Sequence, residues 1–126
     1  MPTEVKGRTV LVCGGRDYAN PAFLWRFLDA AHARNPIGVL IHGACRTGAD
    51  KMADDWALER GIPVRRYPAD WATYGRSAGP MRNQRMLDEA RPDEVIAFSG
   101  GRGTADMVRR AREAGVPVTL ASEALR

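Results

Sequence analysis

Short apolar runs alternate along the chain with longer segments whose apolar residues recur at helical spacing. The runs have the length of buried strands and lie at 9–13, 37–42, 63–67, 95–98 and 116–120. The segment after residue 48 is the clearest helical one, because its apolar positions share one helical face: Ala49, Met52, Ala53, Trp56 and Ala57. The pattern predicts five strands separated by helices.

Residues with strong end preferences mark the expected helix limits. Asn20-Pro21 is typical of a helix start, and Asn35-Pro36 of a helix end. Arg60-Gly61 and Gly115 are expected to end the second and the last helix. Further helices are expected over 80–90 and 104–114, whereas 68–79 is expected to be irregular.

This alternation predicts an α/β fold, a Rossmann-like three-layer domain with a mainly parallel sheet of about five strands. We expect a single domain over residues 1–126, with its core at 9–120. The prolines around 63–67 place that strand at or near a sheet edge.

Three glycine-rich loops follow predicted strands, at 14–18, 43–50 and 99–104, and each contains an arginine. Carboxyl ends of parallel strands meet at one edge of a sheet, and a glycine turn that enters a helix favours phosphate. The bland alternative is a set of tight turns that need a positive φ. The candidate ligand-binding residues in these loops are Gly14, Gly15, Arg16, Gly43, Thr47, Gly48, Asp50, Ser99, Gly100, Gly101, Arg102, Gly103 and Thr104.

Composition is that of an ordinary water-soluble domain, with 44% hydrophobic and 27% charged residues in 126. No apolar run is long enough for a membrane helix, and the polar segment 1–8 does not resemble a signal peptide. We therefore expect a cytoplasmic protein with no membrane partner. Its two cysteines, Cys13 and Cys45, are expected to be free thiols.

The net charge of +4 raises the question of nucleic acid, but no block of five basic residues occurs. Arginines next to glycines suit one anion pocket better than an extended groove, so nucleic acid is an unlikely partner and rests on charge alone. The chain also lacks the G-x-G-x-x-G and G-x-x-x-x-G-K-[ST] motifs. An NAD-dependent dehydrogenase and a P-loop ATPase are therefore disfavoured, and we expect no cofactor and no metal.

Five motifs, in this order along 9–120, resemble those of the SLOG superfamily, in its YspA/YpsA-related branch. They are C-G-G-R-D-Y at 13–18, H-G-A-C-R-T-G-A-D-K-M-A-D-D-W-A at 42–57, A-D-W at 69–71, A-G-P-M-R-N-Q-R-M-L at 78–87 and A-F-S-G-G-R-G-T at 97–104. The resemblance implies a Rossmann-like fold that binds a nucleotide or an ADP-ribose-like ligand, as a sensor, carrier or sequestering protein. It also implies a homodimer, and it implies no established reaction.

The chain is more distantly similar to the LOG phosphoribohydrolases, which release a base from a nucleoside 5′-monophosphate. Their motif pairs an arginine with P-G-G-x-G-T-x-x-E. Here Arg82, followed by Asn83, resembles the arginine, but Met107 stands where the catalytic glutamate is expected and Ser99 replaces the proline. Asp106 is one residue earlier, a rotation of about 100° on a helix. Arg82 and Asp106 are thus the catalytic candidates of an alternative hydrolase function.

Other residues have two interpretations each. Asp50 either complements a helix dipole or contacts a ribose, and Asp17 either lies in the pocket or stabilises its loop. Trp71 and Tyr74 either stack on a base or pack at the sheet edge. His42 has no evident carboxylate partner, which favours a structural role. Neither cysteine has a nearby motif that supports zinc binding or nucleophilic catalysis.

Overall fold

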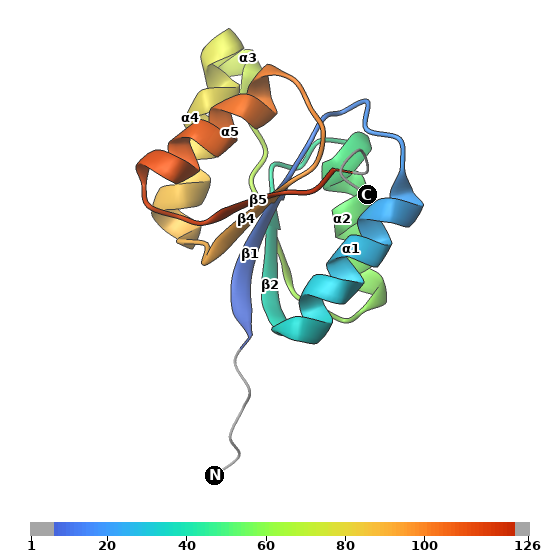
Figure 1. Cartoon of the computed structure of the whole chain (residues 1–126). Helices are drawn as coiled ribbons and strands as arrows, with labels where there is room; N and C mark the ends of the chain where they lie inside the picture. Colours follow the sequence, from blue (N-terminus) through green and yellow to red (C-terminus); the bar gives the residue numbers. More distant parts are fainter. Residues whose placement is uncertain (1–6, 123–126) are drawn as a thin grey trace.

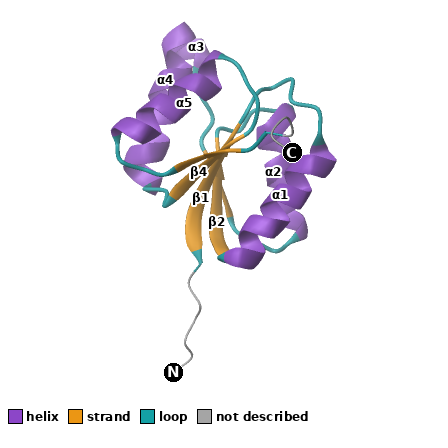
Figure 2. Cartoon of the chain, in the orientation of Figure 1, coloured by secondary structure: helices purple, strands orange, loops and turns teal. Residues whose placement is uncertain are grey.

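A five-stranded parallel sheet forms the centre of the computed structural model (Figure 2). The strands are β1 (Arg8–Cys13), β2 (Ile37–His42), β3 (Val64–Arg66), β4 (Glu94–Ala97) and β5 (Val118–Leu120). Their spatial order is β3-β2-β1-β4-β5, and every neighbouring pair is parallel. The predicted α/β Rossmann-like fold is confirmed, and β3 lies at an edge as its prolines indicated.

Helices cover both faces of the sheet and complete three layers (Figure 1). One layer contains α1 (Pro21–Arg34) and α2 (Gly48–Glu59), which pack on each other. The other contains α4 (Ala78–Arg85), which continues as a π-helical turn η2 (Met86–Ala90), and α5 (Arg102–Glu113). The short helix α3 (Trp71–Tyr74) and the 3₁₀ turn η1 (Gly75–Ser77) precede α4.

Alternation along β1 divides the core between the two layers. Val10 and Val12 lie in the cluster formed with α1 and α2, whereas Leu11 and Cys13 lie in the cluster formed with η2 and α5. Because β1 is central and buried on both faces, its residues are almost continuously apolar. The same feature made this strand easy to recognise in the sequence.

The predicted helix ends agree with the structure. The Asn20 side chain accepts a hydrogen bond from the Phe23 N–H, with Pro21 at the first helical position, and Asn35 is the C-cap of α1. Gly61 and Gly115 have φ of +71° and +78°, a backbone region that glycine occupies without a steric penalty.

Two predicted boundaries are wrong. Residues 68–79 are not irregular, because Asp70 caps α3 by accepting a hydrogen bond from the Thr73 N–H, and η1 then leads into α4. The last helix begins at Arg102 rather than Thr104, so Arg102 and Gly103 belong to its first turn. Glycine content suggested a loop there, but tertiary placement of the β4–α5 turn overrides that weak propensity.

The chain order creates a crevice above the middle of the sheet. From β1 the chain proceeds outwards to β2 and β3, then crosses back to β4 on the other side of β1. The loops after β1 and β4 therefore diverge towards opposite layers. Ligands of open α/β sheets bind at such a switch point, beyond the carboxyl ends of the strands.

The structure describes residues 7–122, so most of the polar segment 1–8 interpreted above, and the end of the C-terminal tail, lie outside it. Within the described part, no helix combines the length and apolar character needed to cross a membrane.

Two tryptophans of different burial offer a test of this packing. Trp56 is fully buried and its indole N–H donates to Asp29 at 2.8 Å, whereas Trp71 is 50% exposed. We expect Trp56→Ala to lower the free energy of unfolding by about 3–5 kcal/mol, and Trp71→Ala to lower it by about 1 kcal/mol or less. Urea denaturation of both variants measures the difference. Equal losses would contradict the assigned core.

Candidate functional site

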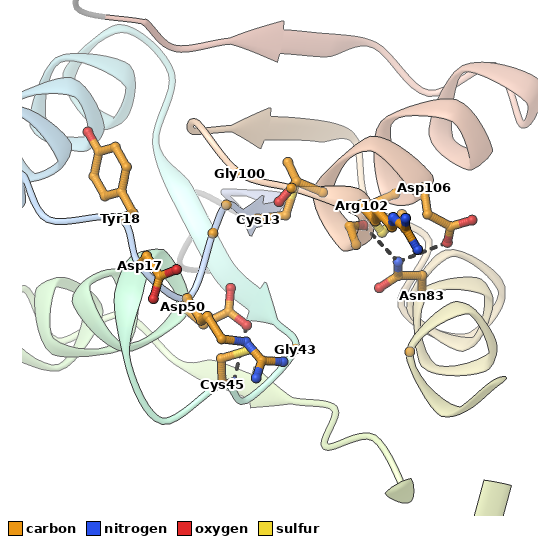
Figure 3. A pocket seen from close by; sticks show the side chains of 18 of the residues that line it. Cys13, Asp17, Tyr18, Gly43, Cys45, Asp50, Asn83, Gly100, Arg102 and Asp106 are labelled. Atoms are coloured by element: carbon orange, nitrogen blue, oxygen red, sulfur yellow. Dashed lines mark hydrogen bonds between the residues drawn. The ribbon is translucent and has the colours of Figure 1, made fainter. Parts of the chain in front are cut away.

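A cavity of about 1150 Å³ opens at the carboxyl ends of β1 and β4. Its walls come from the loops after β1, β2 and β4, from the first turns of α5, and from α3, η1 and α4 (Figure 3). Its volume is at or above the upper end of the range of about 300–1,000 Å³ that is usual for small-ligand sites. The cavity therefore has room for a ligand larger than a single sugar phosphate.

Close packing of two glycine loops forms the floor of the cavity. The Gly15 N–H donates to the Ser99 carbonyl at 2.8 Å. A Cβ on Gly15 would lie 3.1 Å from the Gly100 Cα, and one on Gly100 would overlap the Thr104 side chain. A Cβ on Gly14 would press on Ala49 of α2. These three glycines are thus required for the approach of backbone to backbone.

Gly101 and Gly103 differ from those glycines, because a Cβ on either would meet no atom within 4 Å. Neither residue has a positive φ, so the alternative of a tight turn that needs one does not explain these two glycines. Both line the cavity, at the N-terminus of α5, where no side chain caps the helix. The first N–H groups of a helix lack intrahelical partners, so this end of α5 presents free donors to the cavity.

The N-terminus of α2 is occupied by the protein itself. The Ala49 N–H donates to the Gly15 carbonyl at 3.2 Å, and the Thr47 hydroxyl donates to the Arg16 carbonyl at 2.9 Å. Gly48 has a φ of +76° and packs directly on Gly15 and Arg16. Thr47 and Gly48, both predicted to contact the ligand, do not line the cavity and instead hold the β1 loop in place.

Arginines around the cavity fall into two groups. Arg16, Arg76 and Arg102 line it, are exposed, and form no ion pair within residues 7–122. Arg82 is half-buried and engaged: its guanidinium donates to the Gly43 carbonyl, to the Tyr67 carbonyl at 3.3 Å and to Asn83 Oδ1 at 3.0 Å. The first group is available to an anion, whereas Arg82 joins α4 to the ends of β2 and β3.

Asn83 and Asp106 link α4 to α5 at one side of the cavity (Figure 3). Asn83 Nδ2 donates to Asp106 Oδ2 at 3.0 Å and to the Gly103 carbonyl at 3.2 Å. Asp106 also accepts from Arg109 at 2.9 Å and from Arg110 at 2.8 Å. Burial opposes ionisation, but these hydrogen bonds outweigh it and lower the pKa of the Asp106 carboxyl. Asp106 is therefore a fixed anion that holds two helices together.

Asp50 lies with Cys45 across the cavity from Asn83 and Asp106 (Figure 3). It is 5% exposed, and its Oδ2 accepts from the Cys45 N–H at 3.2 Å. Burial raises the pKa of the Asp50 carboxyl, although the Cys45 N–H, His42 and Arg82 act against it. Burial also raises the pKa of Cys13 to about 12 and that of Cys45 above its ordinary value, so neither thiol has the thiolate character of a nucleophile.

His42 does have a carboxylate partner, contrary to the sequence analysis. Its Nε2 lies 2.7 Å from Asp54 Oδ1, and its Nδ1 accepts from the Ala44 N–H at 2.9 Å. Asp54 lies twelve residues later on α2, and pairs with Arg66 as well. With both ring nitrogens engaged and only 2% of the residue exposed, His42 fixes the β2 loop and does not line the cavity.

The structure brings most of the predicted site residues together around one cavity. Lining it are Gly14, Gly15, Arg16, Gly43, Asp50, Arg82, Asn83, Ser99, Gly100, Gly101, Arg102, Gly103, Thr104 and Asp106. Sequence reasoning did not include Tyr18, Asn20, Gly79, Pro80 and Met86, which also line it. Tyr18 and Asn20 could have been predicted from their closeness in sequence to the first glycine loop. Gly79, Pro80 and Met86 line the cavity only because α4 and η2 pack beside it.

Comparison with known proteins identifies the family. The model of the YspA, cpYpsA-related SLOG family matches residues 8–74, more than half of the chain. The chain belongs to this SLOG family. The match includes the loops after β1 and β2, and ends before the β4–α5 turn.

One relative of this SLOG protein spans nearly the whole chain. Gene 61 protein of Mycobacterium phage D29 is 39% identical over 119 residues, which cover 88% of this chain and 94% of the relative. The similarity therefore includes the β4–α5 region that the family model does not reach.

Solved structures share the fold at low sequence identity. MurG of Acinetobacter baumannii and the E. coli tRNA N6-threonylcarbamoyladenosine dehydratase TcdA each have a TM-score of 0.52 and 14% identity, over 90% of this chain. The chain spans 34% of the former and 50% of the latter, so the likeness shows the Rossmann-type fold alone.

The Asp106 network predicts a pH-dependent contribution to stability. A carboxyl whose pKa is lowered by folding stabilises the protein above its unfolded pKa of 3.8, and this contribution is lost as the pH falls through the lower folded value. We expect Asp106→Asn to lower the free energy of unfolding by about 2 kcal/mol at neutral pH, with a difference that shrinks below 3.8.

Urea denaturation across this pH range measures the effect. Asp88→Asn is the matched control, because Asp88 is exposed and, among the side chains of residues 7–122, accepts from Gln84 alone, at 3.0 Å and one helical turn away. We expect a change below about 0.5 kcal/mol. A loss for Asp106→Asn that is the same at all pH values would contradict the assignment.

Proposed function

We propose that this SLOG protein binds a phosphorylated nucleotide or nucleotide-derived ligand, such as an ADP-ribose-like molecule, in the cavity beyond β1 and β4. The observation that supports this most is the N-terminus of α5, where Gly101 and Gly103 leave space for a ligand and the N-cap residue Gly101 offers no side chain to cap the helix. Phosphate fits such an end because free N–H groups and the helix dipole both favour an anion.

Three arginines that form no ion pair within residues 7–122 line the same cavity as that helix end. Arg102 lies in the first turn of α5, Arg16 lies on the adjacent β1 loop, and Arg76 projects from η1. Other arginines have carboxylate partners, as Arg66 has Asp54 and Arg110 has Asp106. Arginines that have no carboxylate partner within residues 7–122 and lie in the same cavity as a helix N-terminus favour an anionic ligand with more than one phosphate oxygen.

A buried carboxylate in the same cavity favours a sugar phosphate over a simple inorganic anion. Asp50 accepts one backbone hydrogen bond, through Oδ2, and its side chain lines the cavity. The oxygens of a buried acidic side chain accept hydrogen bonds from hydroxyl groups. A ligand with phosphate at α5 and ribose hydroxyls towards Asp50 satisfies both ends.

The geometry favours binding over the hydrolase alternative. Met107, at the position of the hydrolase glutamate, is 1% exposed and lies in the core. The Asp106 carboxylate already accepts from three side chains, and Arg82 already donates to two carbonyls and Asn83. Neither group is available in this arrangement to stabilise a ribosyl cation or to activate water. A role as sensor, carrier or sequestering protein follows, and a homodimer remains our prediction.

Gly101→Val tests the phosphate site directly. Because a side chain here meets open space, the variant is expected to fold while it fills the volume that a phosphate would occupy. We expect AMP and ADP-ribose, tested by calorimetry, to lose at least tenfold in affinity through loss of the helix-end contacts.

Ala105→Val is the matched control for this test, since it places the same side chain on the first turns of α5 outside the main cavity. It should bind both ligands like the wild type. Equal binding by Gly101→Val would remove α5 as the phosphate site.

A nucleotide panel distinguishes binding from hydrolysis. Methionine at position 107 provides no carboxylate for catalysis, and loss of an acid–base group typically costs ~10²–10⁴ in rate. We therefore expect that chromatography detects no free base after incubation with nucleoside monophosphates. Asp106→Asn should then alter affinity only modestly. Release that requires both Arg82 and Asp106 would establish the hydrolase instead.

A further inference from the structure

We propose that Trp71 is the stacking platform for the base of the ligand, so that the cavity has a distinct aromatic-base subsite on the α3–η1 wall. This inference rests on the proposed function, because it assigns the part of the same ligand that does not contact α5.

Trp71 combines two features that a packing residue rarely has together. It lines the cavity, and it is 50% exposed although tryptophan has the largest apolar side chain of any residue type. An exposed indole beside a concave site remains in water until something covers it. Its position suits a flat aromatic partner, which is the chemical class of a nucleobase.

Gly79 of α4 fixes the indole against the wall. A Cβ on Gly79 would lie 3.1 Å from the Trp71 Cη2, so the absence of a side chain allows the six-membered ring to approach the helix backbone. Glycine inside a helix lowers its stability relative to alanine. The close approach of the indole explains why glycine is present at position 79. One part of the ring therefore packs on α4, and the rest is open to the cavity.

The short helix that presents Trp71 is held at both ends. Asp70 accepts from the Thr73 N–H at 3.1 Å, and Gly75 adopts a φ of +55° to turn the chain. Figure 1 shows α3 at the end of the molecule where the loops after β1 and β4 also lie. Arg76 follows on η1 and also lines the cavity. The same wall thus offers an aromatic face and a cation, which together recognise a base linked to a phosphate.

Other exposed or cavity-lining aromatic residues are less suited to this role. Tyr18 also lines the cavity, but its ring packs on Phe98 with centroids 5.6 Å apart. Tyr74 is 49% exposed, nearly as much as Trp71, but does not line the cavity. Tyr74 is therefore a matched control on the same helix.

Two probes that differ only by the base separate this subsite from the phosphate site. AMP contains both a base and a sugar phosphate, whereas ribose 5-phosphate lacks the base. Stacking of one base on an aromatic residue corresponds to about five- to hundredfold in affinity. We expect Trp71→Ala to weaken AMP binding by about tenfold or more and to leave ribose 5-phosphate binding within about twofold. Trp71→Phe should recover part of the AMP affinity, and Tyr74→Ala should match the wild type.

Tryptophan fluorescence gives a second readout that a merely structural role would not produce. AMP should quench the wild-type emission, ribose 5-phosphate should not, and the quenching should be absent in Trp71→Phe while Trp25 and Trp56 still emit. Equal weakening of both probes by Trp71→Ala would show a structural role and overturn the proposal. Unchanged AMP affinity would overturn it as well, while the proposed function stands. If the wild type binds neither these two probes nor ADP-ribose, the proposed function fails, and this inference with it.

Discussion

The contact between the β1 loop and the β4 loop is the constraint on which the rest of the site depends. The backbones of the two loops lie so close that a Cβ on Gly15 would be 3.1 Å from the Gly100 Cα. A hydrogen bond from the Gly15 N–H to the Ser99 carbonyl joins the two loops. This contact directs the β4 chain into α5 with the helix end facing the cavity. It is possible only because the switch point makes β1 and β4 neighbours in the sheet.

The α2 side of the site serves that same contact. The Ala49 N–H at the start of α2 donates to the β1 loop and Gly48 packs on that loop with a positive φ, so this helix end helps to hold the loop in place. Two helix ends that look alike in sequence thus have different functions. The N-terminus of α2 holds the β1 loop in the floor of the cavity, whereas the N-terminus of α5 faces the cavity itself.

Charge is divided in a similar way between structure and ligand. Arg82 donates to backbone carbonyls, and Arg109 and Arg110 pair with Asp106. These three cations therefore have partners within the protein. Arg16 and Arg102 lie at the cavity without carboxylate partners within residues 7–122. Part of the positive charge of the chain therefore lies where the proposed phosphate would bind.

The sequence by itself determined the succession of strands and helices along the chain and the positions of the glycine loops that meet at the site. These follow from local causes: Asn20 and Gly61 act on adjacent backbone, and β1 is apolar because both its faces are covered. Tertiary structure alone decided the partners of side chains far apart in the chain. Asp54 reaches His42 across twelve residues, and packing of α4 on α5 engages Asp106 and places Gly79 beneath Trp71. No local pattern encodes such pairs, because they depend on which helix faces cover which side of the sheet.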